Sequence, residues 1–377
     1  SPGPVRSPGR ADGSDGGRAP VPGDARESAR TGVQPGAEPS GDDGYLATHG
    51  GVWDEHMSER TEPPERTDGI HHVTAVSGDA QETVDFYAAV LGLRLVKKTV
   101  NFDDPSTYHL YFGDETGSPG TILTFFPFGG GFGGRVGTGQ TSATAFSIPD
   151  GSVEFWVDRL AGLGVDADEP AERFGETVLP LRDGDGQPIE LVESDSPIEP
   201  WAGGPVPAEH AIRGFYGITL LSARPDATAE VLTRLGYERA EEAGDRTRFR
   251  TGGDRAAVVD VRDPGDAIGG RQGAGTVHHV AFRAPDDDAQ FAWRDRLIDE
   301  GLHVTGQKDR QYFRSIYFRE PGGVLFEVAT DGPGFAIDED LSELGTDLKL
   351  PPWLAEDREF LEDRLPPVAV REATEAD

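Results

Sequence analysis

The sequence predicts an α+β fold made of four versions of one βαβββ unit, between about residues 68 and 330. Each unit opens with a short strand of alternating pattern, continues with an amphipathic helix and then runs through three further strands. The first and last units open with a His-His pair, His71-His72 and His278-His279, in similar sequence frames. Because only nine histidines occur in 377 residues, we interpret the two pairs as matching points of two copies of the unit.

The elements of the first two units follow from apolar spacing and glycine stops. The first unit is expected to have its opening strand at 70–76, its helix at 80–91 before Gly92, and strands at 93–96, 108–112 and 121–126. The second is expected to open at 142–146, to carry a helix near 153–159 and to end at 189–192.

The last two units repeat the pattern. The third is expected to open at 215–220, with a helix at 228–235 and a last strand around 257–261. The fourth is expected to open at 277–282, with a helix at 287–300 and a last strand at 323–329.

Four regions divide the chain. Residues 1–66 are rich in Gly, Pro, Ser, Asp and Arg and predict a disordered N-terminal extension. The only methionine, Met57, suggests a true start there, although a functional tail is the rival interpretation. Residues 67–200 and 201–330 each hold two units, and residues 331–377 form a tail expected to pack on the body through Trp353. The glycine-rich stretch 129–134 is expected to be a connector, because no strand-turn-helix frame surrounds it.

Composition excludes several function classes. The formal net charge of -33 repels nucleic acid and anionic lipid, so neither is an expected partner. Only four lysines occur, and such an acidic, lysine-poor surface indicates a protein that works in high salt; an ordinary acidic cytosolic protein is the alternative. The absence of cysteine excludes disulfides and thiolate chemistry. No apolar run approaches a membrane span or a signal peptide, so a cytoplasmic location is expected.

A series of motifs narrows the fold. The first His-His pair is followed by Val-Asn-Phe-Asp-Asp-Pro at 100–105, Tyr-His-Leu-Tyr-Phe-Gly-Asp at 108–114, Pro-Gly-Thr at 119–121 and Leu-Pro-Pro-Trp-Leu at 350–354. In this order the motifs resemble the vicinal oxygen chelate superfamily, which includes glyoxalase I and the extradiol dioxygenases, and within it the hydroquinone-type ring-cleaving dioxygenases. The resemblance covers about residues 68–365. It implies two incomplete barrels, each built from two units, with a metal held between the units of one pair.

Aligning the four units with each other locates the metal. The place of His72 in unit one is filled by Ala143, Gly217 and His279 in the later units. The place of Glu327 in unit four is filled by Thr124 in unit one and Glu190 in unit two, whereas unit three shows no clear carboxylate. Pairing units one and four is therefore the choice that gives two histidines and one carboxylate, and the resemblance implies the same pairing. We expect His72, His279 and Glu327 as metal ligands, with Glu190 as a solvated carboxylate at a strand end.

Two imidazoles and one carboxylate are the ligand set of non-heme Fe(II) oxygenases, and Mn(II) fits the same ligands. The resemblance places His71 and His278 beside the site, although a regular strand would turn them to the opposite face and leave them as core histidines. It also places Thr74, Arg310 and Tyr317 near the substrate. A surface salt bridge is the alternative role for Arg310, and a core aromatic for Tyr317. We interpret His109 as structural and His303 as exposed.

The resemblance implies an Fe(II)-dependent ring-cleaving dioxygenase that acts with O2 on a small hydroquinone- or catechol-type diol. A glyoxalase-like isomerase or thiol transferase is a second hypothesis, but such sites usually have an extra carboxylate where this chain has Thr124. A non-catalytic binding protein of the same fold is a third, and the intact ligand set argues against it. The sequence does not determine the diol, the choice between catabolism and detoxification, or whether the chain forms a homo-oligomer.

Overall fold

The computed structural model describes residues 64–128 and 133–372. The predicted extension at 1–66, including Met57, lies almost wholly outside the described residues, as do four residues of the glycine-rich connector. The remaining two glycines of the connector pass beside the chain that precedes the fourth unit, where Gly134 donates a backbone hydrogen bond to Ala274.

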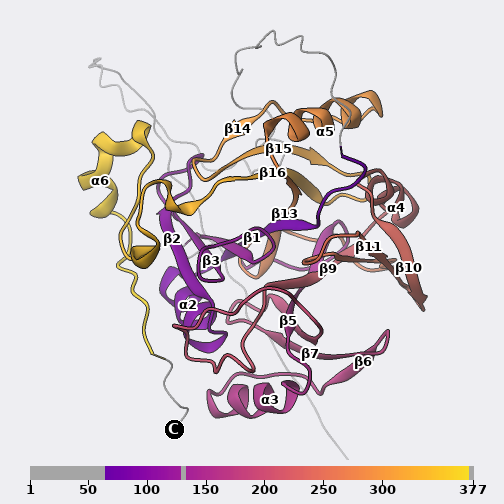
Figure 1. The fold of residues 1–377 in the computed structure, drawn as a ribbon, viewed down its shortest axis with the longest axis horizontal. Helices are drawn as coiled ribbons and strands as arrows, with labels where there is room; N and C mark the ends of the chain where they lie inside the picture. Colours follow the sequence, from indigo (N-terminus) through magenta and orange to yellow (C-terminus); the bar gives the residue numbers. More distant parts are fainter. Residues whose placement is uncertain (1–63, 129–132, 373–377) are drawn as a thin grey trace, which may run out of the picture. The chain divides into compact units, whose positions relative to one another are not determined.

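The first two units contain the expected elements (Figure 1). Unit one consists of β1 (Ile70–Ser77), α2 (Ala80–Val84), the π-helix η1 (Asp85–Val90), β2 (Arg94–Val100), β3 (Tyr108–Gly113) and β4 (Ile122–Pro127). Unit two consists of β5 (Gln140–Ile148), α3 (Val153–Gly162), β6 (Ala171–Arg173), β7 (Glu176–Arg182) and β8 (Pro188–Glu193). The predicted first helix is thus a short α-helix that continues as a π-helix. Asp79 caps its start by accepting hydrogen bonds from the backbone N–H groups of Gln81 and Glu82.

The last two units and the tail complete the fold. Unit three consists of β9 (Phe215–Leu221), α4 (Pro225–Arg234), β10 (Glu238–Ala243), β11 (Arg246–Arg250) and β12 (Val258–Arg262). Unit four consists of β13 (Thr276–Ala284), α5 (Asp287–Asp299), β14 (Lys308–Asp309), β15 (Phe313–Arg319) and β16 (Leu325–Pro333). The tail has 3-10 turns η2 (Phe335–Ile337), η3 (Leu341–Glu343) and η4 (Pro352–Asp357) and the helix α6 (Arg358–Glu362). Across the described ranges, no helix is both long enough and apolar enough to cross a membrane.

The predicted pairing of units one and four is confirmed by the sheet order. One eight-stranded sheet runs β14-β15-β16-β13-β1-β4-β3-β2, and the other runs β10-β11-β12-β9-β5-β8-β7-β6. The first sheet therefore joins units one and four across the antiparallel pair β1/β13, and the second joins units three and two across β9/β5. Figure 1 shows β1 beside β13, although they come from opposite ends of the folded chain. The division into halves at 67–200 and 201–330 remains a description of the sequence alone.

Each seam between paired units contains two β-bulges at matching places. In the first sheet, Ile70 pairs with Phe282 and His72 with Ala281, so His71 is the extra residue of β1. Further along, Thr74 pairs with His279 and Ala75 with Val277, which makes His278 the extra residue of β13. The second sheet has the same irregularities at Ser142 and Tyr216. A bulge places one extra residue opposite a single partner and re-aims its side chain.

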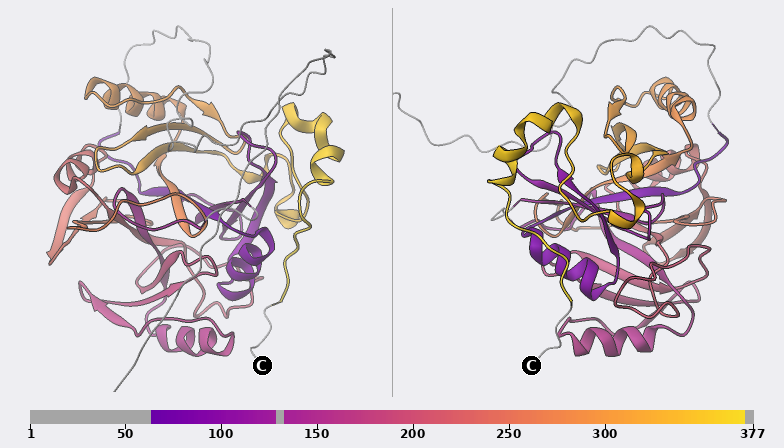
Figure 2. Two further views of the ribbon diagram at one scale, coloured as in Figure 1. Left: turned by 180° about the vertical axis from the view of Figure 1, so that it is seen from behind. Right: turned by 60° about the vertical axis from the view of Figure 1, so that its left-hand side comes forward.

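The tail, yellow in Figure 2, lies along the outer strands of unit one. Leu348 bridges to Lys98 of β2, and the Tyr108 hydroxyl of β3 donates to the backbone oxygen of Pro366. The attachment of the tail is mainly ionic and apolar. Lys97 of β2 is fully buried, its Nζ lies 2.7 Å from Asp338 Oδ1, and it also contacts Glu339. Phe335 and Leu344 pack into an apolar cluster with Tyr111, and the indole of Trp353, half exposed, lies 5.5 Å from the ring of Phe102. Trp353 therefore contributes less to docking than the sequence suggested.

Lys97→Met should detach the tail, because it leaves the carboxylates of Asp338 and Glu339 without their buried cation. We expect a loss of about 3 kcal/mol or more in the free energy of unfolding, measured by urea denaturation. Lys349→Met is the matched control, since Lys349 lies 3.7 Å from the same Glu339 but is partly exposed, and it should cost under about 1 kcal/mol. Equal losses in the two variants would contradict the assigned role of Lys97.

Candidate metal centre

Three side chains that lie far apart in the sequence meet on the inner face of the first sheet. His72 Nε2 lies 3.3 Å from His279 Nε2, and Glu327 Oε2 lies 3.3 Å from the first and 3.0 Å from the second. Two histidines come from the paired strands β1 and β13, while Glu327 comes from β16, which is parallel to β13. Among the described residues this trio is the His/Cys/Asp/Glu group placed to hold a metal ion. These are the three ligands that the internal alignment predicts.

The bulges explain why four histidines share one site. Side chains of a regular strand alternate between faces, so adjacent histidines would point apart. The extra residue in each strand instead brings His71 and His278 back beside their neighbours. His71 Nδ1 lies 2.9 Å from His72 Nδ1, and His278 Nδ1 lies 2.8 Å from His279 Nδ1. The predicted position of His71 and His278 beside the site therefore agrees with the structure, although their function is untested.

These contacts leave one nitrogen of each ligand histidine for a cation. If the Nδ1 atoms of His72 and His279 donate to the neighbouring histidines, their Nε2 atoms keep a lone pair directed at the trio. Burial lowers the pKa of His278 to about 3 and that of His71 well below its usual value, so both imidazoles are neutral and able to accept a proton in a hydrogen bond. An outer hydrogen bond of this kind fixes the tautomer of a metal-binding histidine.

Glu327 is buried in a way that calls for a cation. Its side chain is fully inaccessible, and neither carboxylate oxygen has a hydrogen-bond donor within bonding geometry in the described structure. Burial raises the pKa of Glu327, whereas His72 and His279, when they are protonated, would outweigh burial and hold the pKa well below the usual value. An ionised carboxylate without donors in an apolar strand is costly unless a cation neutralises it. The donor set and its geometry therefore fit a divalent metal ion.

The other predicted site residues lie around this trio. Thr74 is fully buried and pairs across the seam with His279. Tyr317 pairs with Glu327 on the next strand, and its ring centroid lies 5.6 Å from that of His279. Arg310 Nε donates to the Tyr317 hydroxyl over 3.1 Å, and its guanidinium also lies 2.9 Å from Asp103 in the loop after β2. Both are thus part of one arrangement beside the trio; their roles toward a substrate remain predictions.

The structure also places the two remaining histidines that the sequence analysis interpreted, His303 and His109. His303 is exposed after α5, as predicted. His109, interpreted from the sequence as structural, lies on the face of the site, where Nε2 is 2.9 Å from Thr124 Oγ1. Burial, and then the nearby His72, lowers its pKa well below the usual value. In the sequence, His109 lies two residues before Tyr111, which predicts that both side chains lie on one face of the strand. Which face this is became clear only from the register of β3 with β4.

The second sheet corrects two expectations about carboxylates. Glu190 is not a solvated group: it is buried and accepts two hydrogen bonds from Arg173, of 2.7 and 2.8 Å. Unit three does have a carboxylate at the matching place, because Asp260 pairs with Thr219 as Glu327 pairs with Ala281. Asp260 accepts hydrogen bonds from Arg246 and Arg248. Arginine side chains thus neutralise both carboxylates where the first sheet would need a metal.

The second sheet also lacks space for a histidine ligand. A Cβ added at Gly217, which matches His279 or His72 in the other units, would lie 2.2 Å from the backbone oxygen of Val258. No side chain fits there without movement of the backbone. Ala143 fills the other ligand position with a single methyl group. The second sheet therefore keeps the bulges and carboxylates of the first but has no imidazole at either ligand position.

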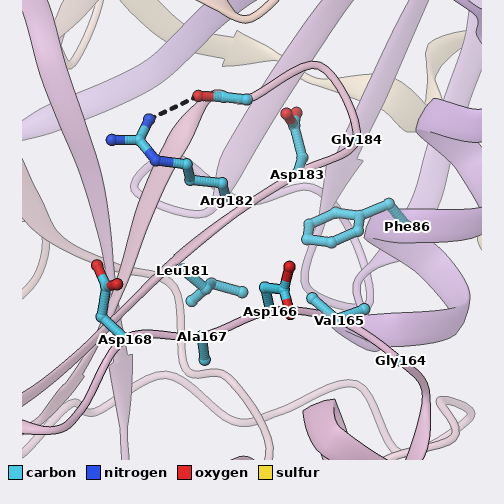
Figure 3. A pocket seen from close by; sticks show the side chains of 11 residues that line it. Phe86, Gly164, Val165, Asp166, Ala167, Asp168, Leu181, Arg182, Asp183 and Gly184 are labelled. Carbon is cyan, nitrogen blue, oxygen red and sulfur yellow. Dashed lines mark hydrogen bonds between the residues drawn. The ribbon is translucent and has the colours of Figure 1, made fainter.

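A separate cavity of about 450 Å³ lies between η1 and the loops of unit two. Figure 3 shows Phe86 and the carboxylates of Asp166, Asp168 and Asp183 around it, with Arg182 bonded to the neighbouring backbone. Asp183 is engaged by the hydroxyl of Tyr87, which donates to it over 2.9 Å. None of the trio lines this cavity, so it is not part of the candidate metal centre.

Comparison with known proteins places both halves of the chain in one family. The model of the glyoxalase/bleomycin resistance protein/dioxygenase superfamily matches residues 69–191 and 204–328. The chain is 48% identical over 310 residues to a Bacillus subtilis protein named "Putative ring-cleaving dioxygenase MhqO", covering 81% of this chain and 98% of that one. It is 39% identical over 303 residues to the chlorohydroquinone/hydroquinone 1,2-dioxygenase of Sphingobium indicum, covering 77% and 94%.

A solved structure agrees with the fold. The crystal structure of a "putative dioxygenase" from Bacillus subtilis superposes with a TM-score of 0.79 at 48% identity, covering 81% of this chain and 99% of that one. The chain therefore belongs to the glyoxalase/bleomycin resistance protein/dioxygenase superfamily.

Proposed function

We propose that the protein is a ring-cleaving dioxygenase that opens a hydroquinone-type aromatic diol with O2 and uses Fe(II). The observation that carries this proposal is the buried trio of His72, His279 and Glu327, whose carboxylate has no donor of its own. Two imidazoles and one carboxylate leave coordination positions open, as non-heme Fe(II) oxygenases require. The names of the two relatives support the same reaction class, and that of the Sphingobium indicum enzyme supports a hydroquinone substrate. Mn(II) would fit the same ligands.

A metal held by His72, His279 and Glu327 would supply a Lewis-acidic and redox-active centre for the reaction of the diol with O2. The protein supports this chemistry by holding the donor atoms rigidly on three hydrogen-bonded strands. His71 and His278 orient the ligand imidazoles through Nδ1. The ring of Phe313, 4.9 Å from that of His72, packs against the trio and helps to exclude water from it.

Arg310 and Tyr317 are placed to bind the oxygen atoms of the substrate. The Tyr317 hydroxyl accepts a hydrogen bond from Arg310 Nε, which fixes the position of that hydroxyl beside the trio. Asp103 holds the guanidinium from the opposite side, which fixes its position at the edge of the site. A cation and a hydroxyl donor fixed in a buried site stabilise negative charge that develops on a phenol oxygen.

A glyoxalase-like isomerase is the weaker proposal. It would need a further carboxylate in unit one at the place matching Glu327, and Thr124 occupies that place. The Thr124 hydroxyl is already engaged by Thr74 and His109. On the side of unit one, the trio therefore has neutral hydroxyl groups and no further carboxylate beside it. This favours a centre with three protein ligands over the glyoxalase-like site.

Glu327→Gln should abolish stable metal binding, because it removes the only anionic ligand while keeping the shape of the side chain. We expect iron per chain, measured by elemental analysis after Fe(II) loading and desalting, to fall at least tenfold. Glu190→Gln is the matched control at the equivalent position of the second sheet and should retain the metal. Equal loss in both variants, or retention in Glu327→Gln, would contradict the assigned ligand set.

His278→Phe should weaken metal binding without abolishing it, because it keeps a ring of similar size but removes the Nδ1 acceptor for His279. Competition with a chelator should show roughly a 10- to 100-fold loss of affinity. The exposed His303→Phe serves as the control and should match wild type. Unchanged affinity in His278→Phe would show that the contact between the two histidines has no influence on the metal.

Oxygen uptake tests the reaction itself. Protein loaded anaerobically with Fe(II) and hydroquinone should consume O2 on mixing, with both oxygen atoms retained in a ring-opened product detected by mass spectrometry with ¹⁸O2. The metal-free protein should consume none. Absence of O2 uptake across hydroquinones and catechols, with iron confirmed in the protein, would refute the proposed function.

A further inference from the structure

A row of four hydrogen-bonded side chains crosses unit one beside the trio. The Tyr111 hydroxyl lies 2.8 Å from His109 Nδ1, His109 Nε2 lies 2.9 Å from Thr124 Oγ1, and Thr124 donates to Thr74 Oγ1 over 2.9 Å. The four residues come from the neighbouring strands β3, β4 and β1. Tyr111, Thr124 and Thr74 are buried, and His109 is partly exposed.

The proton count sets the direction of this row. A threonine hydroxyl has one proton, and Thr124 uses it on Thr74. Thr124 must therefore accept from His109, which places the imidazole proton on Nε2. Burial lowers the pKa of His109 well below its usual value, so the ring is neutral and its Nδ1 can only accept, in this case from Tyr111. Each group donates to the next, from Tyr111 to Thr74.

The last hydroxyl in the row keeps its own proton. Thr74 accepts from Thr124, and no acceptor for the Thr74 proton is found within residues 64–128 and 133–372. Thr74 pairs directly with His279 across the seam and lies two residues after His72, on the same strand face. A buried donor without an acceptor is unfavourable unless a ligand completes it. The available proton therefore lies next to two of the three predicted metal ligands.

We propose that Tyr111, His109 and Thr124 are positioning residues that hold the Thr74 hydroxyl as a hydrogen-bond donor to an oxygen of the bound aromatic diol. This inference rests on the proposed function for the identity of the ligand. The hydrogen-bonded row acts through Thr74. Without Thr124, the Thr74 hydroxyl rotates freely and its proton has no fixed direction. The matching position in unit four is Glu327, so the same place in the two units provides a metal ligand in one and a relay hydroxyl in the other.

A double-mutant cycle tests the coupling. Hydroquinone is titrated anaerobically into Fe(II)-loaded wild type, Thr74→Val, Thr124→Val and the double variant. We expect each single variant to raise the Kd roughly fivefold, the loss of one hydrogen bond, and the double variant to bind no worse than Thr74→Val. Thr124→Ser should restore most of the affinity. The control is Thr144→Val in β5, which removes an equally buried hydroxyl that has no hydrogen-bond partner. Wild-type affinity in Thr124→Val, or losses that multiply in the double variant, would overturn the proposal.

The tautomer of His109 provides a readout that needs neither metal nor substrate. In protein labelled with ¹⁵N-histidine, the ring nitrogens of His109, assigned by loss of its signals in His109→Gln, should show the Nε2–H form at neutral pH. The Nδ1–H form would contradict the proposed direction of the hydrogen-bonded row. A failure of the proposed function gives a different result, because wild-type protein would then bind hydroquinone but consume no O2. In that case the double-mutant cycle and the His109 tautomer would still decide the role of the hydrogen-bonded row.

Discussion

The antiparallel seam between β1 and β13 is the constraint on which the site depends. It joins the first and last units of the folded chain and brings His72 within 3.3 Å of His279, across 207 residues. The bulges at His71 and His278 lie at the same seam. Each turns its histidine toward one predicted ligand, His71 toward His72 and His278 toward His279. The second sheet has bulges at the matching places, Ser142 and Tyr216, so the bulges belong to the repeated unit and the first sheet fills them with imidazoles.

The two sheets show alternative solutions to one electrostatic problem. Both carry buried carboxylates at the matching strand position, Glu327 in the first and Glu190 and Asp260 in the second. Guanidinium groups neutralise the pair in the second sheet, with bidentate geometry at Glu190. Glu327 has only the two imidazoles, which are weak partners when neutral. The same arrangement of strands thus holds an ionic network in one sheet and a candidate cation site in the other.

Much of the site could be predicted from the sequence because the units repeat. Aligning the four copies predicts that only His72 and His279 fill the ligand position, and the pairing of units one and four then selects Glu327 over Glu190. The structure contains that trio. The alignment missed Asp260 because its matching place opposite Thr219 depends on the register of β12 with β9. Glu190 was expected in solvent because its partner Arg173 lies on a short strand with no distinctive pattern.

By itself, the sequence determined the repeat, the strand and helix order and the residues that could bind a metal, because these depend on local periodicity and on chemistry at matching positions. Only the tertiary structure decided the faces of His71 and His278, since one inserted residue reverses the alternation of a strand and leaves no mark in composition. The contact of His109 with Thr124 depends on the pairing of β3 with β4. The tertiary structure also decided how Lys97 holds the tail and how Thr124 joins His109 to Thr74. Those contacts join separate strands or distant segments, so they exist only once the register and the packing of the chain are set.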